Sequence, residues 1–211
     1  MLATKRIKGI LLGLILLPIV QACVPLAAVG MFGGALSAVD RRSLGTQTED
    51  GVIEWKADAQ VRKALGDVGH INYTSFNRKV LISGEVKDEA SKIAVGQEVV
   101  KVANVKSIHN ELRVAGSSSL LSRTSDSYLT GKVKTRLVDA DKELSTNSIK
   151  VVTEAGVVFL MGIVSAREAQ IATQTASTTA GVSKVISIFE IFSDEQIRAL
   201  DTQGGKKTPA Q

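Results

Sequence analysis

Hydrophobic and polar positions follow the same order twice along the chain. Each copy starts with apolar residues at helical spacing, continues with two short apolar runs around a turn, and ends with a second helical pattern and an extended run. The clearest shared stretch is a strand, a glycine and the start of a helix, at residues 80–90 and again at 158–169. Because the copies lie roughly 78 residues apart, the pattern predicts a tandem domain duplication rather than a solenoid.

The first copy is predicted to run helix, strand, strand, helix, strand. Asp50 is the expected N-cap of the first helix and Gly66 its end. The expected buried stripe is Ile53, Ala57, Val61 and Ala64 or Leu65. Strands are expected at 71–76, 80–86 and 105–114, with a helix after Asp88 that carries Ala90, Ile93, Ala94 and Val100. A helix between two strands favours a parallel, right-handed crossover, so we predict a three-stranded mixed sheet with two helices on one face.

The second copy repeats this order with more apolar strands. Asp126 is the expected cap of a helix that buries Leu129, Val133, Leu137 and Ala140. The strands at 157–163 and near Phe192 are apolar on both faces, whereas a half-exposed sheet would alternate. We therefore expect the outer face of the second sheet to be covered, either by the first copy or by another protomer.

The N-terminus has the features of a bacterial lipoprotein signal. Lys5, Arg6 and Lys8 precede a short apolar run, and Ala22 stands before the single cysteine, Cys23, in a sequence that resembles a lipobox. The run is too short to span a bilayer. We expect Cys23 to become the acylated first residue of the mature protein, and several acyl chains would anchor it stably. An ordinary cleaved signal and an uncleaved anchor are the alternatives.

These patterns predict an α+β protein with two small domains behind an export signal. The expected divisions are a signal peptide at 1–22, an anchor and tether at 23–51, domains at 52–115 and 126–192, a linker at 116–125, and a disordered tail at 193–211.

Charge and composition exclude several functions. The formal charge of +5 includes three cations of the predicted signal, and their removal leaves 23 basic against 21 acidic residues. With no run of Arg and Lys among aromatics, we expect no nucleic-acid partner. The two histidines lie far apart without zinc spacing, so no metal and no cofactor is expected besides the lipid on Cys23. No nucleophile elbow or phosphate loop is present, and the chain is predicted not to be an enzyme.

The repeated strand–Gly–helix pattern behind a lipobox resembles the BON domain. The resemblance covers nearly everything from Cys23 to Phe192, including Ser43–Gln47, Val151–Glu154 and Phe159–Gly162. It implies two tandem BON domains of α-β-β-α-β fold in an outer-membrane lipoprotein that faces the periplasm. It also implies phospholipid binding and a part in envelope integrity and at the division site.

The first helix of the second copy is the predicted phospholipid-binding site. With its apolar stripe against the sheet, an aromatic residue and basic residues point elsewhere, which suits a membrane interface. The predicted contacts are Tyr128, Leu129, Lys132, Lys134, Thr135 and Arg136, and the resemblance implies lipid contact by this same helix. The alternative is that Tyr128 packs between the copies and the lysines form an ordinary solvated face. Trp55, off the stripe of its own helix, is a second candidate interface.

Two functions remain open from the sequence. One is a tethered module that binds anionic phospholipid membrane and supports outer-membrane integrity. The other is a protein-interaction adaptor or periplasmic stress protein that acts on envelope-assembly, cell-wall remodelling or cell-division partners. Salt-sensitive binding to anionic vesicles separates the two.

Overall fold

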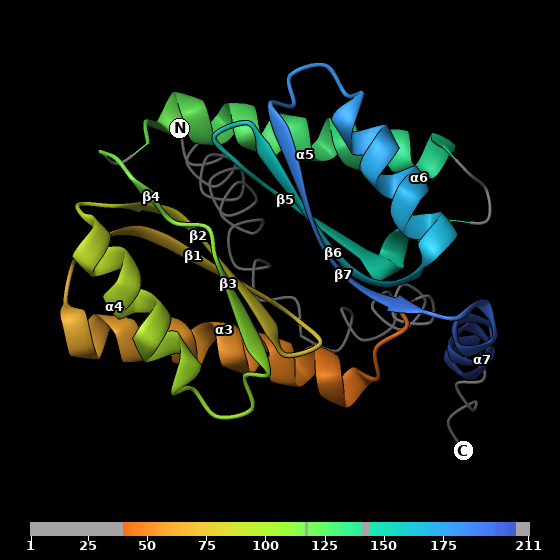
Figure 1. Ribbon diagram of the computed structural model, residues 1–211, viewed down its shortest axis with the longest axis horizontal. Coiled ribbons are helices and arrows are strands. Elements are labelled where there is room, and N and C mark those ends of the chain that lie inside the picture. Colours follow the sequence, from red (N-terminus) through yellow and green to blue (C-terminus); the bar gives the residue numbers. More distant parts are fainter. Residues whose placement is uncertain (1–39, 117, 141–143, 206–211) are drawn as a thin grey trace, which may run out of the picture. The chain divides into compact units, whose positions relative to one another are not determined.

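The computed structural model describes residues 40–116, 118–140 and 144–205 (Figure 1). The predicted signal peptide, Cys23 and most of the predicted tether lie outside the described residues. The elements in chain order are α3 (Leu44–Leu65), β1 (Gly69–Phe76), β2 (Lys79–Val86), α4 (Glu89–Val100), β3 (Ser107–Asn110), β4 (Arg113–Val114), α5 (Leu120–Ala140), the 3-10 turn η2 (Thr146–Ser148), β5 (Ile149–Glu154), β6 (Val157–Ser165), α6 (Ala166–Ser177), β7 (Lys184–Phe192) and α7 (Asp194–Gly205).

Two mixed sheets confirm the predicted α+β fold. In the first copy β1 and β2 are antiparallel, and β3 and β4 run parallel to β2 as two pieces of one edge. In the second copy β5 and β6 are antiparallel and β7 is parallel to β6. Each parallel pair is joined through a helix, as the crossover argument predicted.

The glycine shared by the two copies is required by close strand packing. A Cβ on Gly84 would lie 2.1 Å from the carbonyl oxygen of His70, and one on Gly162 would lie 2.6 Å from that of Ser148. Any larger residue would therefore push the antiparallel neighbour away. This explains why the strand–Gly–helix pattern is the most visible feature that the copies have in common.

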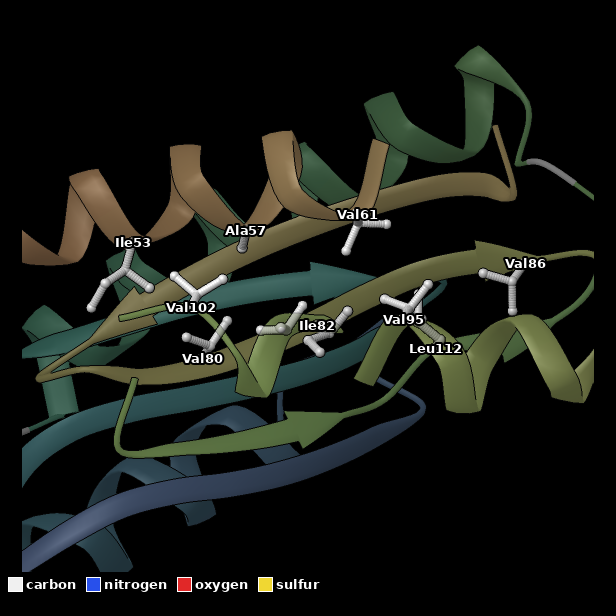
Figure 2. Close-up of a cluster of buried hydrophobic side chains, with 10 residues drawn as sticks. Ile53, Ala57, Val61, Val80, Ile82, Val86, Val95, Val102 and Leu112 are labelled. Atoms are coloured by element: carbon white, nitrogen blue, oxygen red, sulfur yellow. The ribbon is translucent and has the colours of Figure 1, made fainter. Parts of the chain in front are cut away.

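The helices cover one face of each sheet. Figure 2 shows Ile53, Ala57 and Val61 of α3 turned toward Val80 and Ile82 of β2, where all five are buried. In the second copy α5 and α6 pack in the same way on alternate residues of the sheet. The buried members of that cluster include Val133, Leu137, Val158, Leu160, Val164, Ala172 and Ala176.

The opposite faces of the two sheets meet in a third apolar cluster. Phe76 and Leu81 of the first copy pack with Phe159, Met161 and Ile188 of the second. Neighbouring residues of β2 and β6 therefore belong to different clusters, because successive strand side chains point to opposite faces. This confirms that the outer face of the second sheet is covered, and the first copy provides part of the cover.

The C-terminal segment provides the rest of that cover, and here the sequence prediction was wrong. Residues 193–211 were expected to be a disordered tail, but Asp194–Gly205 form α7, whose Ile197 and Leu200 join the third cluster. Burial of these two side chains stabilises a helix that is otherwise polar.

Arg41, just before α3, ties the start of the described chain to this same region. Its guanidinium donates to both carboxylate oxygens of Glu168 at 2.8 Å, to Asp201 of α7 at 2.8 and 3.1 Å, and to the carbonyl oxygen of Ile163. Burial works to lower the pKa of the Arg41 guanidinium, but the hydrogen bonds and charges of Asp201 and Glu168 outweigh it and the pKa is raised.

Both first helices begin earlier than the sequence indicated. Ser43 caps α3 by accepting a hydrogen bond from the Thr46 amide, and α5 begins at Leu120, so part of the predicted tether and linker is helical. Asp50 and Asp126 are therefore not N-caps but buried residues inside helices. Asp88, in contrast, caps α4 as predicted.

The predicted apolar stripes need three further corrections. In α4 the buried residues are Val95, Gly96 and Val99, whereas the expected Ala90, Ile93 and Val100 are exposed and Ala94 is half-buried. The stripe choice failed because small and branched residues occur on both sides of this helix. Of the two expected ends of the α3 stripe, Leu65 packs against the core whereas Ala64 is exposed, and Ala140 at the end of the α5 stripe is also exposed. Within the ranges given above, no helix is both long and apolar enough to cross a membrane.

Candidate functional site

The helix α5 is held on its sheet by an apolar stripe and a buried carboxylate. Leu129, Val133 and Leu137 turn inward and are almost completely buried. Asp126, one turn earlier, accepts hydrogen bonds from the amides of Ala155 and Gly156 at 2.9 Å. These contacts join the helix to the β5–β6 turn and fix which residues of α5 face solvent.

The outward face of α5 carries exposed apolar side chains. Tyr128 is 74% exposed, and Leu120 and Val138 are 79% and 59% exposed. Leu120 and Val138 lie on one side of the helix, five turns or about 27 Å apart, and Tyr128 lies about 80° around the axis from both. Tyr128 does not pack between the copies, which rules out that part of the alternative raised by the sequence. Exposed apolar side chains on a helix with charged flanks have the character of an interfacial helix.

Basic side chains lie on both flanks of this outward face, and hydrogen bonds orient two of them. Lys132 Nζ donates to the carbonyl oxygen of Ala180 at 2.9 Å. Arg136 Nη1 donates to the carbonyl oxygen of Thr175 at 3.1 Å and to Thr179 Oγ1 at 2.8 Å. These neutral partners orient the cations, and within the described ranges they leave the charge of both uncompensated.

The helix α5 has a positive net charge. Lys134 is exposed on the flank opposite Lys132, and Thr135 is exposed on the outward face. The charged residues of the helix are Arg123, Lys132, Lys134 and Arg136 against Asp126 and Asp139, a net charge of +2. Each cation near an anionic lipid surface contributes about 1 kcal/mol to binding.

Lys134 also lines a hollow of about 330 Å³ between α5 and residues of the first copy. The other two cations of its lining already have partners. Arg42 is paired with Asp40 and Asp50 at 2.7 Å and stacks 3.9 Å over the Phe76 ring, and Lys150 is paired with Glu54 at 3.0 Å. The hollow is thus mostly charge-neutral, so the candidate surface is the exposed face of α5 rather than this hollow.

The structure changes the predicted residue set in two ways. Leu129 is only 7% exposed and would stand 3.4 Å from a Cβ on Gly181, so it is a packing residue and is removed from the set. Leu120 and Val138 are added. Their eighteen-residue spacing was the available signal, but Leu120 had been assigned to the linker. We call Leu120, Tyr128, Lys132, Lys134, Thr135, Arg136 and Val138 the α5 surface.

Trp55 occupies a separate surface on α3. Its side chain is 70% exposed and, with Ala59, Gln60 and three lysines, borders a hollow of about 320 Å³ beside the end of α4. The helices α3 and α5 cover different sheets, and the faces of these sheets opposite the helices meet each other. The Trp55 surface is therefore distinct from the α5 surface.

In the part of the chain described above, no group of three or more His, Cys, Asp or Glu side chains is arranged to hold a metal ion. His70 lies on β1 and His109 on β3, both partly buried. The chemistry that the α5 surface offers is contact with an anionic, partly apolar surface.

Comparison with known proteins agrees with the two-copy fold. The sequence model of the BON domain matches residues 55–116 and 125–191. The chain is 36% identical over 180 residues to outer membrane lipoprotein DolP of Haemophilus influenzae, covering 81% of this chain and 89% of that protein. It is 34% identical over 157 residues to the 21 kDa hemolysin of Actinobacillus pleuropneumoniae, covering 71% and 78%.

Two solved structures of CdsD, a structural protein of the type III secretion system of Chlamydia trachomatis, are also similar. One covers 74% of this chain and 100% of its own at 12% identity and a TM-score of 0.26; the other, a C-terminal domain, covers 64% and 96% at 11% and 0.28. Scores this low carry no argument. The two matched segments and the similarity to DolP show that the chain belongs to the BON-domain family, with two such domains in tandem.

Proposed function

We propose that this protein is a non-enzymatic, lipid-anchored periplasmic module that binds anionic phospholipid through the α5 surface. Acylation at Cys23 would hold it at the outer membrane, and its binding would support the integrity of that membrane, with the division site as an expected place of action. The lipobox pattern and the similarity to a protein named as an outer membrane lipoprotein support the anchor and its location.

The observation that carries the proposal is the composition of the exposed face of α5. An aromatic ring that is 74% exposed shares this face with two exposed aliphatic side chains, and Lys132 and Arg136 on its flank donate to neutral groups among the described residues. Tyrosine rings lie at the level of lipid headgroups, and lysine stems cover apolar surface while the ammonium stays in water. The face therefore suits the boundary between headgroups and acyl chains.

Vesicle flotation of a soluble form spanning residues 24–211 tests this function. The wild type should float with phosphatidylcholine vesicles that contain phosphatidylglycerol, and should stay behind with phosphatidylcholine alone or in high salt. Tyr128→Glu removes the ring and adds a repelled charge, and should weaken binding more than about tenfold.

Trp55→Glu is the matched control, since it places the same charge at an equally exposed aromatic on the other copy. It should leave flotation unchanged. Circular dichroism of both variants checks that they are folded. Full flotation of folded Tyr128→Glu would contradict the proposal, and failure of the wild type to bind anionic vesicles would favour the adaptor function instead.

A further inference from the structure

Trp55, the single tryptophan of the chain, lies exposed beside a hollow that the proposed lipid function does not use. The hollow, of about 320 Å³, lies where α3 passes the end of α4. Contacts between Gln60 and Glu98 at 2.8 Å and between Asn104 and Glu49 at 2.7 Å hold the two segments together. The hollow is therefore a fixed feature of the first copy.

Three lysines surround the ring, and two of them have no partner in the described ranges. Lys101 Nζ pairs with Glu98 Oε1 at 2.6 Å. For Lys56 and Lys63, residues 40–116, 118–140 and 144–205 provide no ion pair and no side-chain hydrogen bond. An exposed tryptophan next to two uncompensated ammonium groups is the composition expected of a recognition site, because aromatic anchors contribute most of the binding energy at protein interfaces.

The hollow beside Trp55 fits a narrow ligand better than a flat bilayer. The carboxylates of α3 already have partners: Asp50 is buried and pairs with Arg42, Glu54 pairs with Lys150, Asp58 pairs with Arg62, and Glu49 accepts from Asn104. Among the described residues, Lys56 and Lys63 are therefore the charges of this helix that remain for a ligand. A narrow ligand can place its own carboxylates at these two lysines and an apolar side chain in the hollow, whereas a flat surface cannot enter the hollow.

We propose that the Trp55 surface, defined by Trp55, Lys56, Ala59, Gln60, Lys63 and Lys101, is the docking site for an acidic amphipathic helix of a partner protein. Lys56 and Lys63 are seven residues apart, two helical turns or about 10.5 Å. Carboxylates at positions i and i+7 of a partner helix match this spacing, and apolar residues at i+3 and i+4 would then lie over Ala59 and Gln60 and enter the hollow that Trp55 borders, as in helix-in-groove recognition.

The intrinsic fluorescence of Trp55 reports on this site alone, because the chain has no other tryptophan. The full chain, in neutral detergent, would be titrated with a synthetic helical peptide carrying glutamates at i and i+7 and leucines at i+3 and i+4. We expect a saturable blue shift of the emission. The same peptide with lysines in place of the glutamates should produce none.

Charge reversal separates specific docking from general attraction. Lys56→Glu with Lys63→Glu should weaken peptide binding more than tenfold. The matched control, Lys106→Glu with Arg113→Glu, changes the net charge equally at exposed positions outside the hollow and should bind as the wild type does.

Four results would overturn the proposal. The first is the absence of a saturable response to the acidic peptide, and the second is an equal response to the lysine peptide. The third is an equal loss of binding in both double variants. The fourth is a blue shift of Trp55 emission when the full chain is reconstituted in phosphatidylglycerol vesicles but not in phosphatidylcholine vesicles, which would mean that a bilayer covers the ring. The lipid proposal would stand or fall separately, on Tyr128.

Discussion

The first helices of the two copies, α3 and α5, have matching inner faces and different outer faces. Each buries three apolar residues at i, i+4 spacing: Ile53, Ala57 and Val61 in α3, and Leu129, Val133 and Leu137 in α5. A buried aspartate lies three residues before each stripe, Asp50 in one copy and Asp126 in the other. Its carboxylate accepts hydrogen bonds from the backbone amides of the hairpin turn. The buried side of the helix, with its apolar stripe and its aspartate, holds the helix on the sheet, and both copies have it.

The outer halves share only an exposed aromatic residue. The ring of Trp55 stands on a helix of net charge −1 beside a hollow, and that of Tyr128 stands on a helix of net charge +2 whose exposed face also carries Leu120 and Val138. Packing on the sheet restricts the inner residues, whereas solvent-facing positions can change at little cost in stability. The difference indicates that duplication kept one fold and allowed two surfaces to specialise.

The largest predicted effect concerns a contact that only the second copy has among the described residues, the Arg41 cluster. Arg41→Ala would leave buried Glu168 and the Ile163 carbonyl oxygen without their partner and release Asp201 of α7. Loss of one member of a buried ion pair costs about 3–5 kcal/mol. Urea unfolding should show this loss, while Arg198→Ala on the exposed side of α7 should change stability by less than about 0.5 kcal/mol. Equal stability of the two variants would mean that Arg41 does not hold the chain ends together.

The second prediction compares the two aspartates. Asp50 accepts hydrogen bonds from Ser75 Oγ and from the Asn77 and Arg78 amides, and also pairs with Arg42. Asp50→Ala should therefore cost about 3–4 kcal/mol.

Asp126 makes only two amide contacts, and Asp126→Ala should cost about 2 kcal/mol. Thermal unfolding of both variants measures the difference. A larger loss of stability in Asp126→Ala than in Asp50→Ala would contradict this account of the two aspartates.

The smallest predicted effect lies where the copies meet. Glu154 of β5 is buried and accepts hydrogen bonds from Asn72 Nδ2 at 3.0 Å and Ser83 Oγ at 3.5 Å. Burial raises its pKa, and the charges of Glu85 and Asp126 raise it further, against the opposing hydrogen bond of Asn72 and the charge of His70. The folded state therefore holds the proton more tightly than the unfolded chain, and stability falls as the pH rises through the folded pKa.

Glu154→Gln keeps an oxygen for Asn72 and Ser83 and removes the charge. This variant should be more stable than the wild type at neutral pH, and the difference should shrink as the pH falls below the raised pKa. Melting temperatures of both proteins, measured from neutral pH down to below the raised pKa of Glu154, give this difference in stability. Glu195→Gln at the exposed start of α7 is the control. A difference that does not change with pH would refute the assigned cause.

Much of the fold was predictable because period and turn signals agree along the chain. The i, i+4 stripe of Ile53, Ala57 and Val61 and the Asp88 cap are local features, and all are present in the structure. The helix start at Leu44 was missed because its first turn contains Gly45 and Thr46, and the start at Leu120 was missed because it directly follows the linker-like run Gly116–Ser119. The helix α7 was missed because only contacts distant in sequence stabilise it, through Ile197, Leu200 and Asp201.

The candidate site was predictable to a lesser extent. The helical period and the position of Tyr128 indicated an outward aromatic ring, and the structure exposes it. The extent of the surface was not predictable, because Leu120 joins it only if the helix begins before Asp126. That Lys132 and Arg136 are oriented by the α6–β7 connection and the end of α6 depends on the crossover, which brings Ala180 and Thr179 beside α5.

An NMR titration of isotope-labelled residues 24–211 tests the central claim, that lipid meets the second copy through α5 and not the first through α3. Amide shifts would be followed on addition of phosphatidylglycerol micelles, with zwitterionic micelles as the reference. We predict that the shifts which depend on the anionic lipid gather on α5, around Tyr128, Lys134 and Thr135, and leave α3 unchanged. Shifts that centre on Trp55, or that the two micelles produce equally, would contradict it.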